Sequence, residues 1–204
     1  MSTTLEDEGV LMLFGPISGS SVQPLIHSIL EHNLRRDRPH LRLYINSPGG
    51  SVDQGFALLD IMAWSRIPIH TTGMGQIASM ALLILMAGAR GRRTLLSRTS
   101  VLSHRFSTTV AGTHADLLAS RVHEDQMYAR ILEHYARCTG VQDLASIEAQ
   151  LLRPTDRWLT ADEAVALGLA DRVLAPPQAE MSARPGPGLA DTTDDGATPE
   201  GDRS

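Results

Sequence analysis

Residues 67–89 of this chain read IPIHTTGMGQIASMALLILMAGA. The first six residues, which are mostly β-branched or apolar, predict a strand, and the glycines that follow mark a turn. The run 77–89 is apolar except for Ser79 and Gly88. At 13 residues this run is too short to span a bilayer, which needs about 20 residues. It therefore predicts a buried helix. A strand, a turn and a buried helix in this order indicate an α/β fold with a mostly parallel sheet.

The same alternation continues in both directions. It predicts strands at 10–14, 41–45, 67–72, 93–96, 101–104 and 169–174, and helices at 21–35, 52–65, 77–89, 113–137, 141–152 and 160–168. We expect a short N-terminal segment 1–9, one folded domain 10–175 and a tail 176–204. The tail has six acidic residues against two arginines and almost no large apolar side chain. It is therefore expected to be disordered.

The composition excludes several classes of function. The 204 residues carry a net charge of −5, and all 18 basic residues are arginines. The missing lysines exclude a Schiff-base lysine, a phosphate-loop lysine and a serine/lysine dyad. The chain also has no excess of basic residues that would indicate nucleic-acid binding. The single cysteine, Cys138, cannot form an intramolecular disulfide, and residues 1–9 lack the pattern of a secretory signal. We expect a cytoplasmic protein.

Two segments are candidates for a nucleophile site. Ser79 lies at the start of the apolar helix, where unpaired N–H groups and the helix dipole favour developing negative charge. The alternative is that Ser79 caps this helix or is a small packing residue. Residues 46–52, NSPGGSV, place adjacent glycines after a strand. This loop either supplies a backbone donor to an oxyanion hole or is only a tight turn.

Acid–base candidates lie further along the chain. His104 ends a predicted strand, whereas most of the other seven histidines are expected on polar helical faces or in loops, exposed to solvent. A His-Glu-x-x-His pattern is absent, so no metal site is expected. Asp156 either pairs with Arg153 or Arg157 or orients an imidazole. Cys138 is expected as a small buried hydrophobic residue rather than a nucleophile.

Several motifs in order resemble the ClpP family of self-compartmentalising serine peptidases. They are 44–52 (YINSPGGSV), 75–80 (GQIASM), 87–93 (AGARGRR), 139–140 (TG), 156–164 (DRWLTADEA) and 168–171 (GLAD). The resemblance covers residues 10–174. It implies a ClpP/crotonase-like fold, with parallel sheets flanked by helices and a protruding handle helix at 113–137.

The resemblance also implies a catalytic triad of Ser79, His104 and Asp156. Ser79 would be the nucleophile, His104 the general base and acid, and Asp156 the group that orients the imidazole. The backbone N–H groups of Gly50 and Met80 would form the oxyanion hole. The expected function is that of a serine endopeptidase, which cleaves unfolded proteins through an acyl-enzyme and carries no cofactor or metal.

The resemblance further implies a tetradecamer of two stacked seven-membered rings, made of this chain alone or with a sister subunit. An AAA+ Clp-type unfoldase would supply unfolded protein or peptide substrates, and that partner would use the ATP. No nucleic acid or membrane partner is expected.

Three departures from the family are visible. Arg105-Phe106 replaces the usual Gln-Pro after His104, nine residues precede the first predicted strand, and the acidic tail is long. Arg105-Phe106 and the short N-terminal segment motivate the alternative of a regulatory or structural subunit in a mixed ring, with little hydrolysis of its own. A crotonase-type acyl-CoA enzyme is a further alternative, but such an enzyme does not need Ser, His and Asp together.

Overall fold

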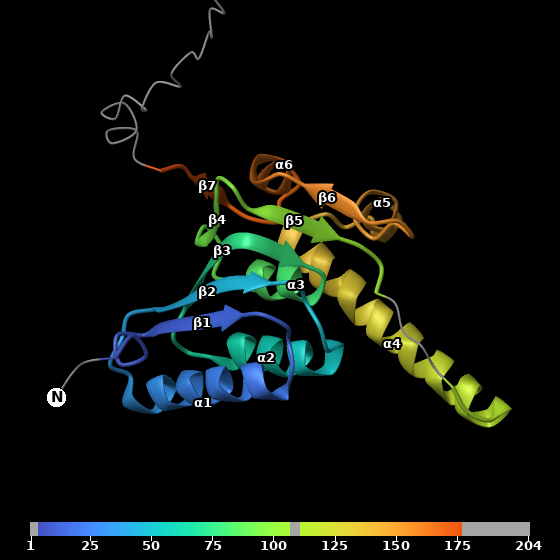
Figure 1. Cartoon of the computed structure of the whole chain (residues 1–204), viewed down its shortest axis with the longest axis horizontal. Helices are drawn as coiled ribbons and strands as arrows, with labels where there is room; N and C mark the ends of the chain where they lie inside the picture. Colours follow the sequence, from blue (N-terminus) through green and yellow to red (C-terminus); the bar gives the residue numbers. More distant parts are fainter. Residues whose placement is uncertain (1–3, 107–110, 177–204) are drawn as a thin grey trace, which may run out of the picture.

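A largely parallel sheet is the frame of the protein. The computed structural model describes residues 4–106 and 111–176. Within them the strand order is β1-β2-β3-β4-β7, with β5 beside β3 and β6 beside β5 (Figure 1). The strands are β1 (Val10–Phe14), β2 (Leu41–Ser47), β3 (Ile69–Ala78), β4 (Arg93–Leu96), β5 (Ser100–Ser103), β6 (Arg157–Leu159) and β7 (Arg172–Leu174). Only the β5–β6 pair is antiparallel among them.

The long strand β3 has two different neighbours on one side. Its first half pairs with β4 through Thr71–Gly73, and its second half pairs with β5 through Gln76–Ala78. On the other side, the register with β2 shifts between Ile45 and Ser47, which is a bulge. Gly75 has φ +63° in this bulge, a value that glycine adopts without steric cost. The bulge redirects β3 towards β5 and so leads the chain to Ser79.

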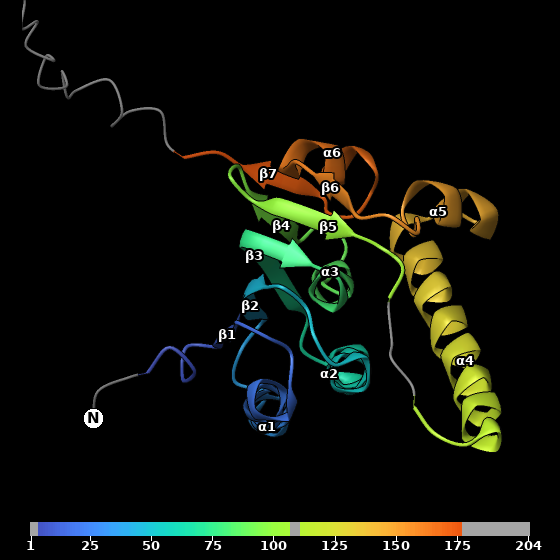
Figure 2. The ribbon, with the colours of Figure 1, turned by 45° about the vertical axis from the view of Figure 1, so that its right-hand side comes forward.

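Helices cover one face of the sheet and project from its end. α1 (Gly19–Arg35), α2 (Val52–Trp64) and α3 (Met80–Met86) form a layer beside the sheet (Figure 2). α4 (His114–Thr139) packs with its second half against α3, while its first half extends away from the body (Figures 1 and 2). α5 (Leu144–Gln150) and α6 (Ala161–Ala166) lie near β5 and β6. No helix in the described residues combines the length and apolar character needed to cross a membrane.

Aliphatic side chains fill the core, as the low aromatic content of 4% requires. All seven residues of α3 are buried, so this short helix is stabilised by burial of apolar surface on every side. One partly buried ion pair supports the far edge of the sheet. Arg93 Nη2 lies 2.6 Å from Asp171 Oδ1 and Arg93 Nε 3.1 Å from Asp171 Oδ2. This two-point contact joins β4 to the residue before β7.

The α/β fold class and the order of most elements agree with the sequence, but several boundaries were wrong. β3 continues through both glycines to Ala78, and the helix predicted at 77–89 is only Met80–Met86. The strand β6 was not predicted, the helix predicted at 141–152 is Leu144–Gln150, and β7 begins at Arg172 rather than at 169. The tail prediction lies, apart from Pro176, outside the described residues. The three-segment division of the chain stays a prediction.

His134 connects α4 to α3 inside the core. Its Nε2–H donates to the Leu83 carbonyl oxygen at 2.9 Å, and its Nδ1 accepts from Arg137 Nη2 at 3.1 Å. Burial, reinforced by the Arg137 charge, lowers the pKa of His134 to about 4, although the bond to Leu83 opposes the shift. The side chain is therefore neutral at pH 7. His32 is buried as well, so neither of these two histidines follows the expectation that most of them are exposed to solvent.

This arrangement predicts a specific pH dependence of stability. Because the pKa of His134 is lower in the folded than in the unfolded chain, the unfolded chain binds the extra proton. The free energy of unfolding should fall by about 3 kcal/mol between pH 6.5 and pH 4 from this residue. His134→Gln keeps a donor for Leu83 but does not titrate, so it should lack this part of the loss. Urea unfolding at several pH values measures the difference; parallel profiles for both proteins would contradict the assignment.

Candidate active site

Ser79 occupies a strained turn between β3 and α3. Its backbone has φ 55° and ψ −125°, and among the described residues Arg36 is the one other non-glycine residue with positive φ. Such conformations cost on the order of 1–3 kcal/mol and persist where the surroundings impose them. Ser79 stands at the N-cap position of α3, but its hydroxyl makes no capping hydrogen bond. The helix-capping alternative for Ser79 is therefore not realised in this structure.

The glycine loop 47–51 holds this turn in place. A Cβ atom on Gly49 would lie 2.8 Å from both the Ala78 carbonyl oxygen and Ser79 Cβ, which is closer than real Cβ contacts. The Gly49 N–H donates to Ser47 Oγ at 3.1 Å, and the Gly49 carbonyl accepts from the Ile17 N–H at 2.8 Å. Only a glycine fits at position 49, so the loop lies directly against Ser79.

Asn46 fixes the bulge in front of Ser79. Its Oδ1 accepts a hydrogen bond from the Gln76 N–H at 3.1 Å, and its side chain packs against the Cα of Gly75. From the sequence alone, Asn46 has no assigned role beyond its place in the NSPGGSV motif. No local signal reveals the role, since the two partners are 30 residues apart.

Two backbone donors near Ser79 are without a protein acceptor in the described residues. Met80 is the first residue of α3, so its N–H has no partner within the helix. The N–H of Gly50 likewise makes no hydrogen bond, although its neighbours Gly49 and Ser51 are both bonded across to Ile17. Backbone N–H groups of this kind can stabilise an oxyanion. These are the two donors that the resemblance implied.

His104 and Asp156 meet at the ends of two antiparallel strands. Ser103 at the end of β5 pairs with Arg157 at the start of β6, so the residues just beyond them face each other. His104 Nδ1 lies 3.1 Å from Asp156 Oδ1. Because an ionised carboxylate only accepts, Nδ1 is the nitrogen that carries the proton in a neutral imidazole, and Nε2 then has a lone pair. The Nε2 atom is buried and has no partner in the described residues.

Asp156 thus contacts the imidazole, which was one of its two expected roles. The arginines offered as alternative partners bond elsewhere. Arg153 Nε donates to the Ala149 carbonyl oxygen at 2.8 Å, and Arg157 donates to that of Gln150.

Ser79 and His104 line the same narrow cavity. Its other walls are apolar or aromatic: Val52, Met80, Leu83, Phe106, Ile131 and Tyr135. Within the described residues the Ser79 hydroxyl and His104 Nε2 do not form a hydrogen bond. Catalytic hydrogen bonds are often long in the absence of substrate. The arrangement brings a serine hydroxyl, an imidazole with a free nitrogen and two backbone donors to one place, a combination suited to acyl transfer.

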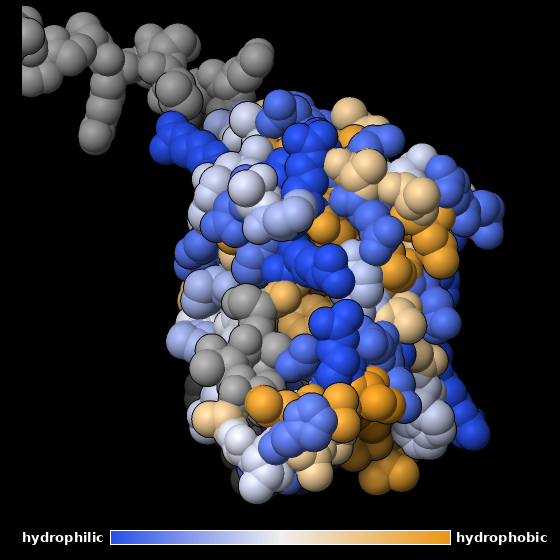
Figure 3. Space-filling view, turned by 90° about the vertical axis from the view of Figure 1, so that its right-hand side faces the viewer, coloured by the Kyte–Doolittle hydropathy of each residue, from blue (hydrophilic) through white to orange (hydrophobic). Residues whose placement is uncertain are grey.

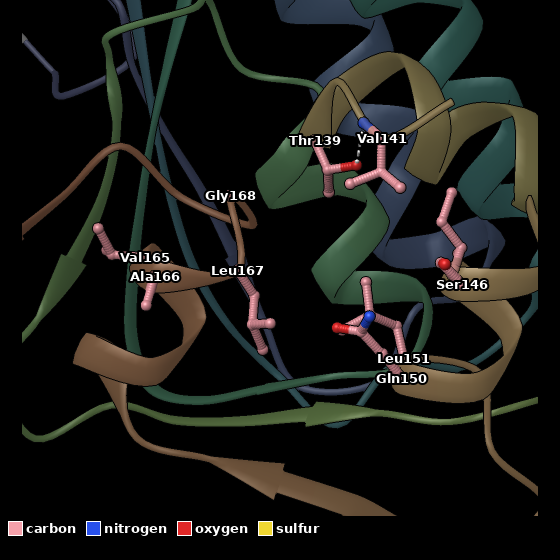
Figure 4. A pocket seen from close by; sticks show the side chains of 10 residues that line it. Thr139, Val141, Ser146, Gln150, Leu151, Val165, Ala166, Leu167 and Gly168 are labelled. Carbon is pink, nitrogen blue, oxygen red and sulfur yellow. Dashed lines mark hydrogen bonds between the residues drawn. The ribbon is translucent and has the colours of Figure 1, made fainter. Parts of the chain in front are cut away.

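The remaining candidates do not join this cavity. Burial raises the pKa of the Cys138 thiol, which keeps it protonated and unreactive. A larger hollow between α4, α5 and α6 is lined by Thr139, Val141, Gln150 and Leu167 among others (Figure 4). It contains no ionisable side chain. Within the described part of the chain, no three His, Cys, Asp or Glu side chains gather in a way that would hold a metal ion.

A comparison with protein families gives an independent result. A family model with the description "Clp protease" matches residues 1–177 of this chain. The match covers most of the chain and includes every residue of the cavity.

The contact between Gly49 and Ser79 predicts a steric effect. Gly49→Ala should destabilise the protein by about 2–4 kcal/mol, the sum of a left-handed alanine and an overpacked contact. Gly91→Ala is the matched control, because Gly91 also has positive φ (+75°) but open space at its Cβ position. It should lose only about 1–2 kcal/mol. Equal losses in thermal or urea unfolding would show that the loop does not press against Ser79.

Proposed function

The chain belongs to the Clp protease family, and from this premise we propose that it is a serine endopeptidase with Ser79 as its nucleophile. Membership makes the protein a peptidase, and therefore a hydrolase. The observation that carries the proposal is the cavity that Ser79 and His104 both line, where the Ser79 hydroxyl makes no capping bond and His104 Nε2 has no partner in the described residues. The contact of His104 Nδ1 with Asp156 supports the same assignment.

The proposed reaction follows from the position of each group. Ser79 Oγ attacks the carbonyl carbon of the peptide bond while His104 Nε2 takes its proton. Asp156, bonded to Nδ1, holds the tautomer and stabilises the imidazolium. The N–H groups of Gly50 and Met80 bind the oxyanion, and His104 then protonates the leaving amine. Water attacks the resulting acyl-enzyme by the same route in reverse and restores Ser79.

The positive φ of Ser79 supports the role of nucleophile. A hydroxyl in a helix cap would be occupied by a backbone N–H group, but here it makes no such bond. The strained turn therefore leaves Oγ free to react, and its energetic cost is met by the packing of α3 and the glycine loop.

Phe106 and Arg105 belong to the same part of the proposal. Phe106 is part of the cavity wall, and the Arg105 guanidinium carbon lies 4.3 Å from the centre of the Tyr128 ring. The Phe106 side chain thus borders the space next to Ser79, which supports the proposal that this departure from the family alters the substrate cleft.

We further propose the family's ring assembly for this chain, with α4 as the handle. The support is the surface of α4. Its first half exposes Leu117, Leu118 and Val122, whereas its buried residues begin at Met127. Hydrophobic surface is visible at the lower end of the face in Figure 3, which looks at the side from which α4 projects. Contiguous exposed apolar residues favour contact with another protein. An AAA+ unfoldase, which spends the ATP, and a cytoplasmic location complete the proposal.

One observation favours a second candidate. The Ser79–His104 hydrogen bond is not formed in the single chain, which fits a regulatory subunit whose site is idle. In that case hydrolysis would require a sister subunit in a mixed ring and would not depend on Ser79.

Substitution of the nucleophile tests the proposal. Ser79→Ala should lower kcat for a fluorogenic peptide by a factor of about 10⁶. The free energy of unfolding should not fall, because the hydroxyl makes no capping bond whose loss would cost stability. Ser97→Ala, at an exposed serine in the turn after β4, is the control and should retain full activity. Unchanged hydrolysis by assembled Ser79→Ala protein would favour the regulatory subunit.

Substitution of the orienting carboxylate tests the triad separately. Asp156→Asn should lower kcat by a factor of about 10⁴, because the amide favours the wrong imidazole tautomer. Asp156 is largely exposed, so its replacement should leave folding and assembly unaffected. Steady-state kinetics on material of confirmed size measures the loss; activity within about twofold of the unmodified protein would remove Asp156 from the mechanism.

A further inference from the structure

A buried pair of hydroxyl groups lies directly behind His104. The Tyr135 hydroxyl is 2.9 Å from Ser103 Oγ, and Ser103 Oγ is 2.6 Å from the Leu151 carbonyl oxygen. Ser103 is fully buried and Tyr135 is 1% exposed. These polar groups therefore depend on each other, because water cannot replace a missing partner at this depth.

The direction of both hydrogen bonds follows from the number of protons. The Leu151 carbonyl can only accept, so the single hydroxyl proton of Ser103 points to it. The Tyr135 hydroxyl must then donate to Ser103 Oγ. Burial raises the pKa of Tyr135 to about 12, so this proton is present at neutral pH. The result is a chain from the Tyr135 hydroxyl through Ser103 to the Leu151 carbonyl, in which each bond strengthens the other.

This chain joins the three segments that surround the imidazole. Ser103 is the residue before His104. Leu151 begins the segment that leads to Asp156, and a backbone bond from the Arg105 N–H to the Arg153 carbonyl (3.2 Å) follows beside it. Tyr135 comes from α4, and its ring contacts the cavity that Ser79 and His104 share. A single tyrosine hydroxyl thus supports both sides of the His104–Asp156 contact.

We propose that Tyr135 is a positioning residue, which acts through Ser103 to hold His104 and Asp156 in register. This inference rests on the proposed serine peptidase function. Tyr135 touches neither His104 nor Asp156 by a hydrogen bond, so its effect is transmitted through the Ser103 hydroxyl. A small displacement of an acid–base group lowers the rate of the chemical step more than it lowers substrate binding.

Tyr135→Phe tests the proposal, because it removes the hydroxyl and keeps the ring. We expect kcat for a fluorogenic peptide to fall by about 10- to 100-fold with KM unchanged. Tyr128→Phe is the matched control. Tyr128 is on the same helix, and its hydroxyl donates a hydrogen bond of 2.7 Å to Glu148 of α5 rather than to Ser103. This variant should keep its kcat. An unchanged kcat in Tyr135→Phe, or a rise of KM alone, would overturn the proposal.

Ser103→Ala provides a second route if Tyr135→Phe fails to assemble. It removes the middle of the chain and should lower kcat at least as much as Tyr135→Phe. If Tyr135 acts through Ser103, the double variant should be no less active than Ser103→Ala. Losses that multiply in the double variant would show that Tyr135 acts by another path and would overturn the proposal.

Amide hydrogen exchange separates this inference from the proposed function, because it does not require activity. In Tyr135→Phe, residues 104–106 and 151–157 should exchange faster than in the unmodified protein, while Tyr128→Phe should leave both segments unchanged. If Ser79→Ala retains hydrolysis, the proposed function fails, and exchange alone decides the role of Tyr135. Unchanged exchange in both segments would then overturn the proposed role of Tyr135 in holding His104 and Asp156.

Discussion

The left-handed backbone of Ser79 is the constraint on which the rest of the site depends. It turns the chain from β3 into α3 within one residue, and it is maintained from two sides. The seven buried residues of α3 fix the helix in the core, and Gly49 lies so close to Ser79 that a side chain at position 49 has no room. The favourable packing of the core thereby offsets the cost of the strained Ser79 backbone, which is on the order of 1–3 kcal/mol. The same turn frees the Met80 N–H and brings the glycine loop beside it.

The two halves of β3 explain how the other groups reach this turn. Asn46 fixes a bulge that redirects β3. As a result, the first half of β3 pairs with β4 and the second half pairs with β5. The Ser79 N–H then donates to the Leu102 carbonyl at 3.1 Å, which places the end of β5 next to Ser79. The antiparallel strand β6 brings Asp156 to the outer side of His104. The site is thus assembled from the carboxyl end of one strand and the adjoining ends of two others, all tied by backbone hydrogen bonds.

The sequence predicted the fold class and the order of most elements, because strand and helix patterns alternate clearly. It failed where neighbours distant in the chain decide the outcome. The glycines at 73 and 75 look like the end of a strand, and residues 77 and 78 fit a buried strand and a buried helix equally well by pattern. Pairing with β5 makes them strand. Most histidines were expected in solvent, and no local pattern marks His134 as an exception, because its acceptor, Leu83, is 51 residues away. For the site, spacing alone left Ser79 and Asp156 with two roles each. The resemblance named the residues, but Asn46, Ser103 and Tyr135 act through contacts 30 to 48 residues apart that leave no local pattern.

We propose that the turn at Ser79 presents a reactive hydroxyl to His104 and to two backbone donors. The most direct test is reaction of the full-length protein with a fluorophosphonate probe, which modifies activated serines. The protein would be separated by size beforehand, and the modified residue identified by mass spectrometry. We expect a single label on Ser79 in the large assembled species. An assembled protein that remains unlabelled, or that carries the label on another residue, would contradict it.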